Sequence, residues 1–169
     1  MNAPHEHHHG SHGHHGQHAT TAGAPSLNAT ALSATLHCLT GCAIGEVLGM
    51  VVGTALELGN VATIALAVVL AFLFGYALTI RPLLRSGLAF GTAAKLALAA
   101  DSASITVMEI VDNAIMLVIP GAMSAGLGSA LFWGSLAISL AIAGAAAFPV
   151  NRWLIARGRG HAVVHAHHA

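Results

Sequence analysis

The chain has 169 residues, a mean hydropathy of +0.75 and only 7% charged residues. Soluble globular domains carry about 25% charged residues, so this composition excludes an ordinary soluble domain and predicts an integral membrane protein. Six basic and six acidic residues give a formal net charge of zero. So few basic residues argue against a nucleic-acid partner.

Residues 1–32 are predicted to form a disordered, histidine-rich tail. Eight of the 13 histidines lie here, among almost no apolar side chains larger than alanine. Such a segment cannot bury enough apolar surface to offset the entropy lost on ordering. A second, basic and histidine-rich tail is predicted at residues 157–169. Because imidazole binds copper, zinc and nickel, we expect both tails to capture metal weakly. The expected capture residues are His5, His7, His8, His9, His161, His165, His167 and His168.

Four long apolar segments lie between the tails, in a predicted transmembrane domain at residues 33–156. Each is near or above the ~20 residues that cross about 30 Å of hydrocarbon, and backbone exposed to lipid must satisfy its own hydrogen bonds. The sequence therefore predicts an all-α bundle of four transmembrane helices in a lipid bilayer. The expected spans are residues 34–56, 61–80, 94–119 and 131–155.

The basic residues predict the orientation of these spans. Three of them flank the second connection and three follow the fourth span, whereas the other two connections carry no Lys or Arg. By the positive-inside rule, the second connection and both termini then lie in the cytoplasm. The basic residues are Arg81, Arg85, Lys95, Arg152, Arg157 and Arg159.

The first span contains the sequence HCLTGCAIGE, from His37 to Glu46. At about 100° per residue, two cysteines and a carboxylate share one helix face with four glycines spaced four residues apart. Small residues at this spacing let another helix approach closely, so we expect a helix-packing surface that turns the thiols and the carboxylate inward. His37 lies about 100° from Cys38 and flanks this face. The residues of the face are Cys38, Gly41, Cys42, Gly45, Glu46, Gly49 and Gly53.

The third span has its own polar face, made by Asp101, Met108, Glu109 and Asp112. A mid-helix carboxylate costs about 2.5–3.5 kcal/mol on insertion scales, so these side chains are not expected to face lipid. The first and third spans run in the same direction, and an offset of 63 residues pairs Cys38 with Asp101. The same offset predicts a continuous polar column in which Cys42 is level with Ile105, Glu46 with Glu109, and Gly49 with Asp112.

The sulfur atoms of this column favour metal handling. Thiolates and thioethers select soft ions such as Cu(I), and mixed Cys, His and carboxylate sets bind zinc. We therefore predict that copper or zinc is bound, and moved, through Cys38, Cys42 and Met108, with His37 joining from the flank.

The carboxylates favour an alternative function. Intramembrane acidic residues mark ion paths and proton relays, so Glu46, Asp101, Glu109 and Asp112 predict conduction of protons or cations. The structural interpretation is that protonated carboxyls hydrogen-bond to neighbouring Ser, Thr and Asn side chains, while the cysteines and methionines only fill the core.

Assembly is a third class of function. A four-span bundle is thin, so we expect a homo-oligomer or a membrane-protein partner, and the chain could act as a small subunit of a membrane complex.

Enzymatic activity is not expected. Cys-x₃-Cys is not the Cys-x-x-Cys of thiol oxidoreductases, and the chain has no phosphate loop, nucleophile elbow or dinucleotide fingerprint.

The end of the fourth span carries predicted interfacial anchors. Trp133 and Trp153 are twenty residues apart, about 30 Å along a helix, which suits aromatic anchors at its two ends. Asn151 and Arg152 are expected beside Trp153 at headgroup level. The alternative is that Asn151 or Arg152 turns inward and caps the acidic column at Asp101.

Three separated motifs resemble one family. The segments HCLTGCAIGE and EIVDNAIMLVIPGAM, and the run Asn-Arg-Trp-Leu at residues 151–154, are similar to the bacterial membrane family called domain of unknown function 4396. The resemblance covers about residues 37–165. It implies a four-helix membrane domain and assigns no activity. The expected location of the chain is the bacterial inner (plasma) membrane.

Overall fold

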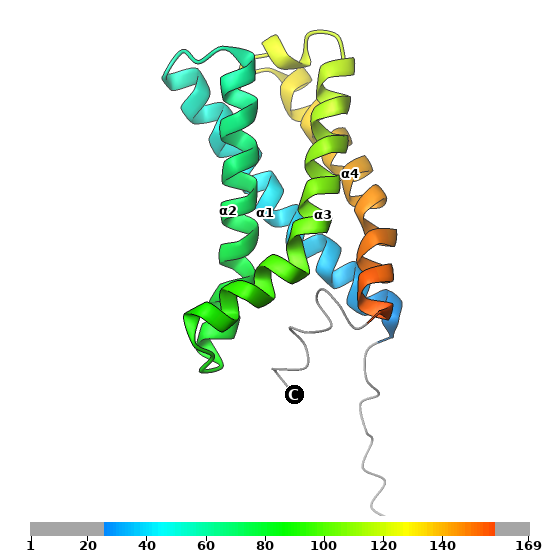
Figure 1. The fold of residues 1–169 in the computed structure, drawn as a ribbon. Helices are drawn as coiled ribbons and strands as arrows, with labels where there is room; N and C mark the ends of the chain where they lie inside the picture. The colour runs from blue at the N-terminus through cyan, green and yellow to red at the C-terminus, as the bar shows by residue number, and fades with distance from the viewer. Residues whose placement is uncertain (1–25, 158–169) are drawn as a thin grey trace, which may run out of the picture.

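The computed structural model describes residues 26–157, which form four long helices and one short 3-10 helix (Figure 1). The elements are α1 (Leu27–Ala55), α2 (Asn60–Arg85), α3 (Phe90–Val118), η1 (Ala122–Ser124) and α4 (Ala130–Ala156). The prediction of an all-α fold is therefore confirmed for this part of the chain. Residues 1–25 and 158–169 of the two predicted tails, with every proposed capture histidine, lie outside the described residues.

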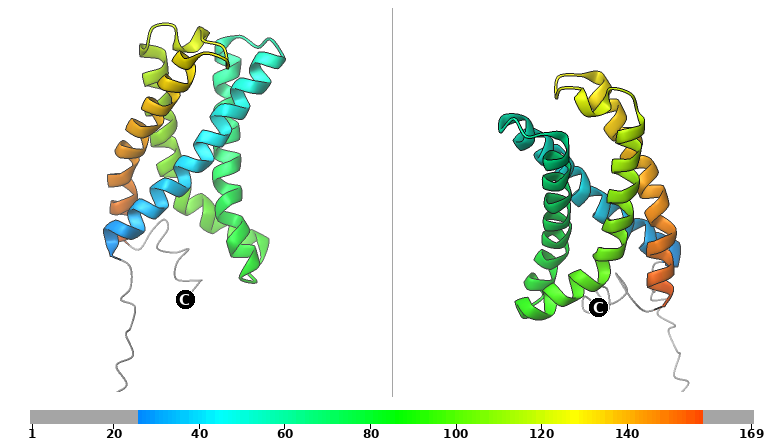
Figure 2. Two further views of the ribbon diagram at one scale, coloured as in Figure 1. Left: turned by 180° about the vertical axis from the view of Figure 1, so that it is seen from behind. Right: turned by 45° about the horizontal axis from the view of Figure 1, so that its top comes forward.

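The four long helices form a bundle in which successive helices run in opposite directions. α1 packs against α2 and α4, α3 packs against the same two helices, and α1 also touches α3 across the centre. Figure 2 shows α1 running obliquely across the back of the other helices. The start of α1, the α2–α3 connection and the end of α4 all lie at one end of the bundle (Figure 1).

Three of these helices, α1, α2 and α4, are long and apolar enough to cross a membrane. The expected span in α3 is not among them. α3 is as long as α1, but Lys95 and three acidic residues, Asp101, Glu109 and Asp112, lower its hydropathy. All three acidic side chains are buried inside the bundle.

Two helix boundaries differ most from the expected spans, the start of α1 and the end of α2. α1 begins at Leu27 rather than near residue 34, so the prediction of a disordered tail as far as residue 32 is wrong for residues 27–32. The reason is an N-cap at Ser26, whose hydroxyl accepts a hydrogen bond from the Ala29 backbone N–H at 3.2 Å. α2 continues past Pro82 to Arg85 and ends where Gly87 takes a positive φ of 90°.

The Ser26 cap gives a testable expectation. Substitution Ser26→Ala removes the hydroxyl acceptor, and loss of an N-cap costs about 1 kcal/mol. We expect backbone amides in the first turn of α1 to exchange about fivefold faster in hydrogen-exchange mass spectrometry. Ser33→Ala, at an exposed position inside the same helix, is the control and should leave exchange unchanged. Equal exchange in both variants would show that the cap does not hold this end.

The glycine face of α1 lies directly against α2. A Cβ atom built on Gly45 would lie 2.2 Å from the backbone nitrogen of Ala71, and one built on Gly41 would lie 2.6 Å from the Cα of Gly75. These contacts leave no room for a side chain. The facing residues on α2 are also small and recur every four positions: Thr63, Ala67, Ala71 and Gly75.

Candidate functional site

The close approach of α1 to α2 directs the neighbouring face of α1 toward α3. Cys38 and Cys42 are at most 1% exposed, and Glu46 is 6% exposed. Ten residues of α1 are buried, and they follow the helical repeat from Ala31 to Gly53. The thiols and the carboxylate therefore lie inside the bundle because the glycine ladder beside them holds α1 in that rotation.

A first polar group lies toward the end of the bundle that holds the two described chain ends. The thiol of Cys38 donates to Oδ1 of Asp101 at 3.7 Å, and both residues are fully buried. Thr79 on α2 also interacts with Asp101, and its hydroxyl lies 2.9 Å from Nε2 of the half-buried His37. This group, called here the His37–Asp101 group, therefore joins α1, α2 and α3.

A buried amide supports the same region from α4. Nδ2 of Asn151 donates to the hydroxyl oxygens of Thr35 at 2.9 Å and Ser104 at 3.0 Å. The prediction that Asn151 is an interfacial anchor is wrong, because its side chain is only 2% exposed and binds α1 and α3. It turns inward, although its contacts are to hydroxyl groups and not to Asp101.

The other predicted anchors are exposed. Trp133 and Trp153 are each about half exposed, near opposite ends of α4. Trp133 donates to the carbonyl of Leu127, and the guanidinium of Arg157 lies 4.1 Å from the ring centre of Trp153. Arg152 donates to Oδ1 of Asn28 at the start of α1.

A second polar group, called here the carboxyl cluster, lies deeper in the bundle. Glu46 of α1 interacts electrostatically with Asp112 and Glu109 of α3, and the hydroxyl of Ser139 on α4 donates to Oδ1 of Asp112. The three carboxyl groups are between 1% and 6% exposed. Four of their six oxygens have no hydrogen-bond partner among the described residues: Glu46 Oε1, both oxygens of Glu109, and Asp112 Oδ2.

No basic side chain balances this cluster within residues 26–157. Every Lys and Arg of that range is exposed. Transfer of ionised carboxylates into an apolar interior without counter-charges is strongly unfavourable. The cluster therefore lacks the positive charge that ionised carboxylates would need at this depth.

The sulfur atoms occupy the level between the two polar groups. Sγ of Cys42 lies 4.0 Å from Sδ of Met108, and both side chains belong to an apolar cluster with Ile105, Ala143 and Ala147. Both cysteines are free thiols. His37 does not join them, since it faces Thr79. In the described part of the chain, no three His, Cys, Asp or Glu side chains are placed so that they could hold a metal ion.

The register of α1 against α3 agrees with the expected offset over most of its length. Cys38 meets Asp101, Cys42 lies in one apolar cluster with Ile105, and Glu46 interacts with Glu109. The departure is at the far end, where Asp112 also interacts with Glu46, whereas Gly49 packs on Ala67 of α2. A constant offset assumes parallel helices, whereas α1 crosses the bundle obliquely (Figure 2).

Two contributors to the site, Thr79 and Ser139, were not predicted. The inward turn of Asn151 was predicted only as an alternative, with Asp101 as its partner instead of Thr35 and Ser104. A signal for Thr79 exists in the sequence, because it continues the four-residue repeat of small residues on α2 that starts at Thr63. Ser139 lies in a span with few other polar residues, and such a residue in a membrane helix commonly faces another helix.

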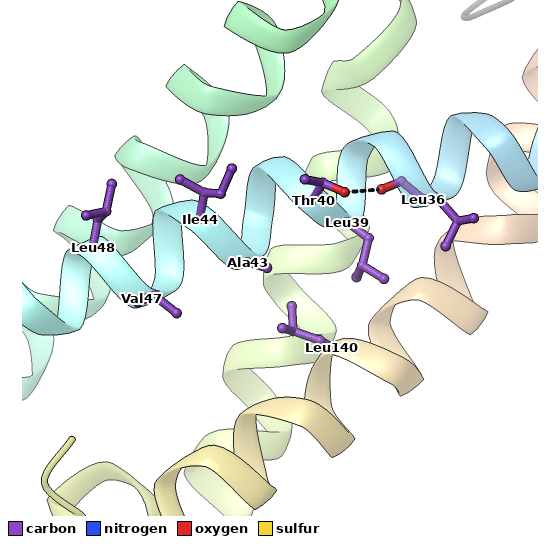
Figure 3. Close-up of a pocket in the computed structure, with 8 residues that line it drawn as sticks. All are labelled: Leu36, Leu39, Thr40, Ala43, Ile44, Val47, Leu48 and Leu140. Carbon is purple, nitrogen blue, oxygen red and sulfur yellow. Dashed lines mark hydrogen bonds between the residues drawn. The ribbon is translucent and has the colours of Figure 1, made fainter. Parts of the chain in front are cut away.

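An apolar groove among the described residues lies outside this site. It has a volume of about 640 Å³ and runs along the outer side of α1 beside Leu140 of α4 (Figure 3). Its one hydroxyl, from Thr40, donates to the carbonyl of Leu36 at 2.8 Å. The groove is otherwise apolar and contains none of the predicted site residues.

Comparison with known proteins gives one match. The family model described as "Domain of unknown function (DUF4396)" matches residues 27–160, which include all four long helices. No curated protein and no solved structure matches the chain. The chain belongs to the family of domain of unknown function 4396.

Proposed function

We propose that this chain is a four-span protein of the bacterial inner membrane that carries protons through its buried carboxyl groups. The observation that carries the proposal is the carboxyl cluster of Glu46, Glu109 and Asp112. It brings three acidic side chains together from two helices, with four unpartnered oxygens and no buried Lys or Arg in the described range. Intramembrane carboxyls that are held away from lipid are the usual elements of proton relays.

The membrane placement rests on the helices and the charges. α3 has the length of a span, and its acidic side chains point into the bundle, so its outer surface can face lipid. Arg81 and Arg85 lie in the last turns of α2, and Arg152 and Arg157 lie at the end of α4. These two helix ends and the start of α1 are at the same end of the bundle (Figure 1). By the positive-inside rule this end faces the cytoplasm, and both termini emerge there.

The proposed path starts at this end. His37 is half-buried, so its ring can exchange protons with water and pass them through the Thr79 hydroxyl to Asp101. Asp101 and Glu109 are eight residues apart on α3, about 12 Å. Cys38 contacts Asp101 and Cys42 lies beside Glu109, so the two thiols bridge this gap. From Glu109 the proton reaches Glu46 and Asp112.

Proton flux into liposomes tests this function. The full chain is reconstituted with a trapped pH-sensitive dye, and a potassium diffusion potential set with valinomycin drives proton entry. We expect flux above that of protein-free liposomes, and a fall of at least tenfold in Glu46→Gln and in Asp112→Asn, because an amide cannot carry a proton between neighbours.

Glu57→Gln is the matched control, since Glu57 is an exposed carboxylate in the α1–α2 connection. Its flux should equal that of the original chain. Flux no greater than in empty liposomes, or full flux in both core variants, would refute the proposal.

A further inference from the structure

Three buried sulfur atoms lie together where α1 meets α3. Sγ of Cys42 and Sδ of Met108 are 4.0 Å apart, and Cys38 lies one helical turn from Cys42 on the same face. All three side chains are at most 1% exposed, and neither cysteine is in a disulfide. The proposed proton path needs no thioether, so Met108 is left without a role.

The spacing of two of these sulfurs suits a metal ion. A metal–thiolate bond is about 2.3 Å long for an ion of the size of zinc. Two sulfurs that each make a bond of this length and lie 4.0 Å apart subtend an angle of about 120° at the ion. That is the angle between neighbouring ligands in a trigonal site, and Cys38 is the nearest further thiol on α1.

The surroundings select the kind of ion. Ile105, Ala143 and Ala147 pack around the sulfurs on one side, and the carboxyl groups of Asp101 and Glu109 lie beside the two thiols. No set of three His, Cys, Asp or Glu side chains that could hold a metal ion occurs within residues 26–157, which disfavours a tetrahedral zinc site. Thiolate and thioether ligands select soft monovalent copper.

We propose that Cys38, Cys42 and Met108 form a binding site for a soft monovalent cation, Cu(I) in the cell. When the ion binds, a metal–sulfur bond replaces each S–H bond. The Cys38 thiol gives its proton to Asp101, which it already faces at 3.7 Å, and the Cys42 thiol gives its proton to Glu109 beside it. Each carboxyl group releases one proton to water in return, so binding of one ion releases two protons. The thioether of Met108 binds without losing a proton. The ion keeps its oxidation state, so no redox partner is needed.

Silver binding tests the site, because Ag(I) is a soft monovalent ion that is not oxidised in air. The detergent-purified full chain is loaded with Ag(I) and washed with excess imidazole, which competes with the histidine tails for silver. We expect one Ag(I) per chain to remain by metal analysis, with both thiols protected from maleimide. Silver X-ray absorption should show sulfur neighbours.

Matched variants identify the ligands. Cys42→Ser and Met108→Leu should each lose at least tenfold in affinity for Ag(I), whereas Met116→Leu, at another buried methionine of the same helix, should bind as the original chain does. Circular dichroism of each variant checks that it is folded. Loss of all silver in imidazole, nitrogen-only neighbours, or full binding by both ligand variants would overturn the proposal. None of these results depends on proton flux, so the sulfur site and the proposed proton path succeed or fail separately.

Discussion

Gly45→Ala is expected to lower the stability of the bundle by about 3 kcal/mol, the upper part of the range for overpacked cores. The added methyl group would lie 2.2 Å from the backbone nitrogen and 2.4 Å from the Cα of Ala71. Backbone atoms cannot rotate away as a side chain can, so α1 and α2 must separate. For a chain of this size we expect the midpoint of thermal unfolding in detergent to fall by roughly 6–12 °C.

Two further variants make this prediction specific. Gly134→Ala changes an exposed glycine inside α4 that has no atom within 4 Å of the added methyl, so it should leave the midpoint unchanged or raise it slightly. Ala71→Gly should not rescue Gly45→Ala, because the clash is with the backbone and not with the Ala71 methyl. A normal midpoint for Gly45→Ala would show that the two helices are not in close contact.

The glycine ladder shows what a sequence with helical periodicity can predict. Gly41, Gly45, Gly49 and Gly53 share a face because 3.6 residues make a turn, and this holds wherever the helix lies in the fold. The identity of the partner helix depends on the tertiary structure. The partner in the structure is α2. Its matching row of small residues, from Thr63 to Gly75, is present in the sequence, but a repeat of small residues does not by itself say which two helices meet.

The candidate site was predictable in its residues but only partly in its contacts. A carboxylate in an apolar span must turn inward, so burial of Glu46, Glu109 and Asp112 follows from its energetic cost. The pairing of Glu46 with Glu109 and Asp112 depends on the angle at which α1 crosses α3, and this angle leaves no periodic signal in the sequence of either helix.

The side chain of Asn151 was wrongly assigned to the interface for a related reason. Its place near a helix end suggested the interface, whereas its hydrogen bonds to Thr35 and Ser104 come from helices far away in sequence.

The carboxyl cluster is also expected to reduce stability. Neither oxygen of Glu109 accepts a hydrogen bond of standard geometry in the described structure, although the side chain is only 5% exposed and the Cys42 thiol, a weak donor, lies beside it. A buried polar group without a partner costs about 1–3 kcal/mol. Burial of Glu109 therefore lowers the stability of the fold, and a residue kept at such a cost in stability indicates a functional role.

Glu109→Met is therefore expected to stabilise the protein by about 1–3 kcal/mol while it abolishes proton flux. Methionine has a similar length and no polar atom to desolvate, so it fills the same space beside Cys42 and Asp112. The thermal midpoint in detergent and the liposome flux are measured on the same preparation. Glu57→Met, which changes an exposed loop carboxylate, is the control and should alter the flux little. If Glu109→Met lowered the midpoint, Glu109 would be a structural residue held by hydrogen bonds, and its place in the proton path would lose its physical basis.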